Sequence, residues 1–128
     1  MADPAIPLQA ALYARLDAEL TVPVYDAVPM GTPYPYVTID SEQASNTSPI
    51  SGRKRADRML YLSVWSDYQG QAEVKPINAE IEAALDERSL PLSDGRAASV
   101  RVERMSTNRD ADGITYQGSV TVRVITQQ

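Results

Sequence analysis

The sequence predicts an α+β fold in which an antiparallel β-sheet carries two α-helices packed on one face. Residues 4–20 and 70–87 repeat apolar side chains at helical spacing. The stretches 36–44, 58–66, 97–107 and 114–126 instead alternate apolar and polar residues, as half-buried strands do. The chain has 128 residues, which suits one domain spanning 1–128 with a core of its own. Helices and strands in this order indicate segregated layers, which is the α+β arrangement.

The first helix is expected over residues 4–20. Asp3 is a suitable N-cap and Pro4 suits the first helical turn, whereas Pro23 ends the pattern. The second helix is expected over 70–87, and Pro76 moves its regular part toward a start near residue 75. The apolar stripes of the two helices are Leu8, Leu12, Leu16 and Leu20 in the first and Val74, Ile77, Ile81 and Leu85 in the second.

A proline-rich corner separates two of the expected strands. Residues 22–28 predict a short strand, and 36–44 predict a longer one. Between them Pro29, Pro33 and Pro35 each fix φ and remove a backbone donor, so regular structure cannot cross this segment. Further along, residues 45–55 are polar and lack periodicity. They predict a long, mobile hairpin loop, a feature that is functional or disordered in most compact domains.

Composition excludes several classes of function. The chain has no cysteine and no histidine, so it has no disulfide, no thiolate metal site and no Ser-His-Asp triad. Its net charge of −5 disfavours wrapping of nucleic acid, because phosphate affinity comes from Lys and Arg. No run of apolar residues is long enough to span a membrane, and the start lacks the features of a secretory signal. We expect a protein that is made in the cytoplasm and has no membrane partner.

Two carboxylate clusters are candidates for chemistry. Asp110 and Asp112 beside Gly113 look like the start of a calcium loop, but the further oxygen ligands are missing and a hairpin turn explains them. The acidic residues of the second helix, Glu80 to Glu87, fit a solvated face, and no pocket is marked for an acid/base pair. We therefore predict no catalytic residue, no metal site, no cofactor and no enzyme activity.

Charge is unevenly distributed along the chain. Arg53, Lys54 and Arg55, with Arg58 nearby, form a basic spot, whereas the segment from Asp67 to Asp94 is acidic. A molecule with one basic and one acidic surface can associate head to tail, and a heterologous contact of this kind that closes forms a ring. Complementary charge would guide register and encounter, and salt would weaken it.

Three segments, taken together in order, resemble those of a known family. They are Tyr25-Asp26-Ala27-Val28-Pro29 with Pro35-Tyr36-Val37, then Val64-Trp65-Ser66, then Asp110-Ala111-Asp112-Gly113. From about residue 5 to residue 126 the chain resembles the tail-completion, or tail-terminator, proteins of long-tailed bacteriophages and gene-transfer-agent-like particles. The resemblance implies a small α+β structural protein of the virion with no active site. It implies a ring, in this family a hexamer, at the head-proximal end of the tail tube that stops tube polymerisation.

The resemblance also implies partners. These are further copies of the chain, which need not associate before assembly, the tail tube protein and the head–tail connector protein. DNA is expected to pass through the lumen without specific binding. An acidic lumen would repel phosphate at short range. We expect the interface residues in the corner, the loop and the acidic helix face: Met30, Tyr34, Arg53, Lys54, Arg55, Glu80, Asp86 and Glu87. Two alternatives stay open: a head-completion or adaptor protein of the connector, and a small ligand-binding or catalytic α+β domain.

Overall fold

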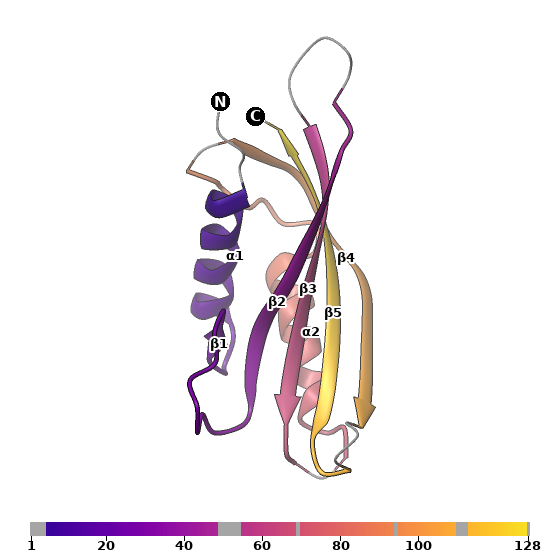
Figure 1. Cartoon of the computed structure of the whole chain (residues 1–128). Coiled ribbons are helices and arrows are strands. Elements are labelled where there is room, and N and C mark those ends of the chain that lie inside the picture. The colour runs from indigo at the N-terminus through magenta and orange to yellow at the C-terminus, as the bar shows by residue number, and fades with distance from the viewer. Residues whose placement is uncertain (1–4, 49–54, 69, 94, 110–112, 128) are drawn as a thin grey trace.

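The computed structural model describes residues 5–48, 55–68, 70–93, 95–109 and 113–127 (Figure 1). The predicted α+β fold is confirmed. Within the described residues, five strands form one sheet in the order β1-β2-β3-β5-β4, and both helices lie on the same face of it (Figure 1). The elements are α1 (Ala5–Glu19), β1 (Val24–Tyr25), β2 (Tyr36–Asn46), β3 (Arg55–Ser66), α2 (Val74–Leu85), β4 (Arg96–Arg109) and β5 (Tyr116–Gln127).

The core lies between the two helices and the covered face of the sheet. The leucines predicted to form the stripe of α1 are buried there, as are the apolar residues of α2. The sheet contributes alternate residues from its central strands, because neighbouring side chains on a strand point to opposite faces. Burying each of these side chains contributes about 1.5–3 kcal/mol relative to exposure. The sheet residues of this layer are Val37, Ile39, Leu60, Leu62, Val64, Val100, Val120, Val122 and Val124.

The sheet differs from the prediction in one pairing. β1 runs parallel to β2, with Val24 beside Val37 and Tyr25 beside Thr38, so the sheet is mixed rather than wholly antiparallel. The antiparallel pairing of β2 with β3 is interrupted between Ile39 and Ser41. Asp40 is the extra residue there, and such a bulge shifts which residues face the core farther along the strand. Two similar irregularities interrupt the pairing of β4 with β5.

Several predicted boundaries were wrong. Ser45, Asn46 and Arg55 are strand residues, because the β2–β3 ladder continues into the polar sequence. Of the rest of the predicted loop, Thr47 and Ser48 are outside the strands, and 49–54 lie outside the described residues. The start of α2 at Val74 agrees with the regular start predicted near residue 75. It places Pro76 in the first turn, where no helical partner for its nitrogen is required. The helix ends at Leu85, so Asp86 and Glu87 follow it and do not belong to a helix face.

Candidate assembly surfaces

The face of the sheet opposite the helices carries a hydrogen-bonded polar network. Asp40 accepts bonds from Thr38 Oγ1, at 2.7 Å, and from Ser63 Oγ. Trp65 Nε1 donates to Thr38 Oγ1 at 3.2 Å, and Gln117 Nε2 donates to Ser63 Oγ at 3.1 Å. Thr38 and Ser63 are buried even though neither helix covers them. The polar atoms of this network satisfy one another, which suits a hydrated surface better than a dry apolar contact.

An ion pair extends this polar face toward the hairpin end of β3. Arg123 contacts Asp57 through Nε at 2.9 Å and Nη2 at 2.5 Å. This hydrogen bonding holds the pKa of the Asp57 carboxyl below its usual value, outweighing the opposing effect of burial. Glu103 lies 3.8 Å from Arg123 Nη1 and adds a second, weaker contact.

The proline corner lies at the end of the molecule where β2 begins (Figure 1), and it carries exposed apolar side chains. Met30 is 104 % exposed, and Val28 and Tyr34 are each more than a third exposed. Thr32 closes the turn: its backbone nitrogen donates to the Pro29 carbonyl at 3.2 Å and its Oγ1 donates to the same oxygen at 2.5 Å. Gly31, at φ 81°, takes the left-handed conformation that this turn needs.

Three tyrosine rings pack against one another beside the corner. The rings of Tyr34 and Tyr36 stack with centroids 5.3 Å apart, and Tyr25 meets Tyr36 edge-on at 5.9 Å. Burial, and then the neighbouring Tyr34, raise the pKa of the Tyr36 hydroxyl. The two candidates predicted here, Met30 and Tyr34, are thus presented on a braced turn, and their role in assembly stays a prediction.

The basic spot predicted around the hairpin is only partly described. Arg53 and Lys54 lie outside the described residues, and Arg55 is exposed at the start of β3. Arg58 was wrongly grouped with them. It is 3 % exposed, on the core side of the sheet, and its Nη1 lies 2.7 Å from Glu42 Oε2. Its Nε donates to Thr126 Oγ1 at 3.0 Å, so Arg58 is part of the interior.

Two of the three predicted acidic candidates use their carboxylates in hydrogen bonds within the chain. Glu80 Oε1 accepts from the nitrogen of Thr21 at 2.9 Å and from its Oγ1 at 3.0 Å. Asp86 Oδ1 accepts from the nitrogen of Val102 at 2.9 Å, which satisfies a backbone group on the outer edge of β4. Glu87 is exposed, although its backbone nitrogen donates to the Val100 carbonyl at 2.9 Å. The acidic helix face expected from the sequence therefore does not exist as a unit.

The sequence reasoning missed an arginine-rich strand at one edge of the sheet. β4 carries four arginines, Arg96, Arg101, Arg104 and Arg109, all of them exposed. Arg109 lies over the ring of Tyr116 at 5.7 Å from its centroid. The four arginines are visible in the sequence in and beside the predicted strand 97–107. They are not consecutive, so they do not form a basic run that marks a surface.

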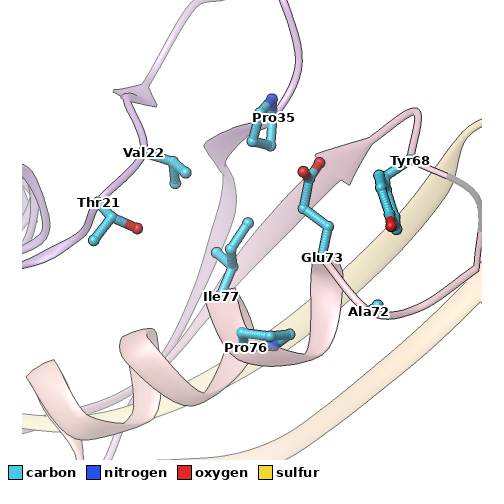
Figure 2. A pocket seen from close by; sticks show the side chains of 8 residues that line it. All are labelled: Thr21, Val22, Pro35, Tyr68, Ala72, Glu73, Pro76 and Ile77. Carbon is cyan, nitrogen blue, oxygen red and sulfur yellow. The ribbon is translucent and has the colours of Figure 1, made fainter.

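A shallow hollow of about 380 Å³ lies between the start of α2 and the segment that follows α1 (Figure 2). Its walls are mainly apolar and are formed by Pro35, Tyr68, Pro76 and Ile77, with Glu73 on one side. Ser66 Oγ donates to Glu73 at 2.5 Å, and Glu73 is the one carboxylate among the lining residues. An acid/base pair needs two such groups in different environments, so the hollow does not support the catalytic alternative.

Comparisons with known proteins agree with the resemblance in the sequence. The family model described as "Tail completion protein gp17" matches residues 7–127. The chain belongs to this family. It is also similar to a chain in a solved structure titled "Virion of native gene transfer agent (GTA) particle", with 28% sequence identity, a TM-score of 0.88 and complete coverage of both chains. No curated protein sequence matched the chain.

Membership of the tail completion family makes this chain a structural protein of a phage-type tail and a virion component. Such a protein assembles with other proteins of the tail and virion. Among the residues that the structure describes, no group of three or more His, Cys, Asp and Glu could hold a metal ion. No helix in that part of the chain is both long and apolar enough to cross a membrane.

Proposed function

We propose that this tail completion protein caps the head-proximal end of the tail tube as a ring, ends tube polymerisation and joins the tail to the head connector. The observation that carries the proposal is the family match over nearly the whole chain, together with the full-length similarity to a chain of a gene transfer agent virion. A hexamer is the ring size that the family resemblance favours. DNA passes through the lumen without specific binding, in keeping with a net charge of −5.

The distribution of exposed groups supports a capping role. The proline corner lies at one end of the molecule, and the end of β2 and the start of β3 lie at the other (Figure 1). A capping subunit needs one surface for the tube and another for the connector, and two dissimilar ends supply them. The corner presents Met30 and Val28 on a turn that is already ordered, so docking through it costs little conformational entropy.

Tube growth in vitro tests the proposal. Purified tube protein is polymerised with and without this chain added at a small fraction of the tube-protein concentration, and tube lengths are measured by electron microscopy. A capping protein stops growth and yields shorter tubes with this chain at one end. An adaptor of the connector leaves the tube lengths unchanged, which would contradict the proposal.

A matched pair of corner variants locates the docking surface. Met30→Asp places a charge on the exposed tip and is expected to abolish the shortening of tubes, because an apolar contact would have to bury it. Thr47→Asp, at an exposed position of the opposite end, is the control for charge alone. If Met30→Asp shortens the tubes as wild type does, the corner does not dock on the tube.

A further inference from the structure

α1 is apolar on two sides. Its leucines face the core, but Ile6 is 82 % and Tyr13 41 % exposed on the other side. Ala10 lies between them, because residues three and four apart share one side of a helix. With Gln9 and Asp26 these residues line a groove of about 460 Å³. An exposed apolar groove on a helix is typical of a surface that contacts another protein.

β4, at the far edge of the sheet, carries a basic surface with one exposed apolar side chain. Met105 is 41 % exposed there. Met105 is opposite Val120, on the side of the sheet that the helices cover. Arg101 and Arg104 precede it on the strand and lie on the other side, opposite Arg123 and Thr121. Neither arginine forms an ion pair with any described residue. Asp86 and Glu87 already bond to the outer backbone of β4 at Val102 and Val100. A partner would therefore meet this edge through side chains and not as an added strand.

The two surfaces lie on opposite sides of the subunit and have opposite charge. β1 and β4 are the two edges of the sheet, and α1 and β4 flank the molecule in Figure 1. β4 carries four arginines and one glutamate, whereas residues 5–28 carry one arginine and three carboxylates. Asp17 and Asp26 are exposed and, within the described part of the chain, belong to no ion pair.

We propose that these surfaces meet between neighbouring copies of this chain. The β4 edge of one copy packs on the α1 groove of the next. Met105, on the helix side of β4, enters the groove against Tyr13, a sulfur–aromatic contact. Arg101 and Arg104, on the other side of the same strand, extend their long side chains past the edge toward Asp17 and Asp26. Because the surfaces differ, the contact is heterologous and repeats in one direction. Such a contact forms a ring when the rotation between neighbouring copies closes. The proposal rests on the capping function above and adds the residues that join its subunits.

Charge exchange tests the contact. Arg101→Glu with Arg104→Glu, and separately Asp17→Arg with Asp26→Arg, should each weaken self-association at the tube end at least about tenfold and leave tubes unshortened. The variant that carries all four changes should regain tube shortening, because the charges are again complementary. Thermal unfolding of each variant checks that it is folded.

The outcomes separate this contact from the capping function. If wild type shortens tubes and either pair of substitutions does so equally well, the contact is wrong and capping stands. If only the arginine pair matters and the four changes do not restore shortening, the arginines face another partner such as DNA, and the contact is again wrong. If wild type does not shorten tubes, capping itself fails.

Cross-linking gives an independent readout. The natural chain has no cysteine, so Tyr13→Cys combined with Met105→Cys supplies one thiol on each proposed surface. A short bismaleimide should convert assembled subunits of this variant into a ladder of covalent multimers. Tyr13→Cys combined with Ser45→Cys, on exposed β2, should give no ladder. Ladders of equal intensity from the two variants would overturn the contact. So would the absence of a ladder from the Tyr13→Cys/Met105→Cys variant when it is assembled in tails of normal length.

Discussion

Gly118 of β5 lies directly beneath Asn78 of α2. A β-carbon at position 118 would stand 2.5 Å from Asn78 Oδ1 and 2.6 Å from Val74 Cγ1. Glycine in a strand ordinarily weakens it, but here it allows the helix to approach the sheet. Asn78 Nδ2 donates to the Ser106 carbonyl at 3.2 Å, so the same contact also ties α2 to β4.

Gly118→Ala is therefore expected to destabilise the protein by about 1–3 kcal/mol, through overpacking of α2 against β5. Urea denaturation followed by circular dichroism measures the change. Ser119→Ala, the next residue on the opposite face, is the control and should change stability by about 0.5 kcal/mol or less. Unchanged stability in Gly118→Ala would show that the helix can shift freely.

The interior pair of Arg58 and Glu42 makes a second prediction. Arg58 is buried while the Glu42 side chain is 25% exposed, so Glu42→Ala removes a partner from a charge that cannot return to water. We expect a loss of about 2 kcal/mol, less than the 3–5 kcal/mol typical of a fully buried pair. Replacing the cation itself, in Glu42→Ala with Arg58→Met, should recover part of that loss. A double variant less stable than Glu42→Ala would contradict this account.

Asp86 supplies a third prediction, on the edge of the sheet. Asp86→Ala leaves the nitrogen of Val102 without its acceptor and should cost about 1 kcal/mol. It should also promote aggregation, since an uncapped edge strand can pair with another chain. Glu87→Ala is the matched control, because only its backbone bonds to β4. Denaturant midpoints and light scattering compare the two variants, and equal behaviour would show that Asp86 does not guard the edge.

The fourth prediction concerns acid stability. Arg123 lowers the folded-state pKa of Asp57 below its ordinary value of 3.8, so the ion pair stabilises the fold above about pH 4. This contribution is lost as the pH falls through the folded-state pKa. The stability difference between wild type and Asp57→Asn should thus be constant from pH 5 to 8 and shrink below about pH 4. Urea denaturation at a series of pH values measures this difference in unfolding free energy. A difference that grows in acid would contradict a lowered pKa of Asp57 in the folded state.

Features set by local spacing could be predicted from the sequence. The leucines of α1 and the alternating valines of β5 identify their elements, because one face of each is buried. The two-residue β1 could not be predicted as a parallel strand, since its register with Val37 depends on a distant segment. The predicted strand 36–44 stopped two residues short of the end of β2. Residues 40–46 are all exposed, so no alternation of buried and exposed residues marks where the strand ends.

The candidate site was predicted less well for a related reason. Exposure of Met30 follows from the prolines around it, which are local. The partners of Glu80, Asp86 and Arg58 come from segments far along the chain, so charge in the sequence alone suggested surface residues where the structure has internal contacts. The arginines of β4 could not be recognised as a candidate interface from the sequence, because that depends on the position of the strand at the edge of the sheet.

The most direct test of the central claim is the length of tails made when the gene for this chain is deleted from the parent particle. Electron microscopy of the lysate gives the distribution of tail lengths. The capping account predicts overlong tubes without heads beside filled heads. Tails of normal length that merely fail to attach, or normal infectious particles, would contradict it.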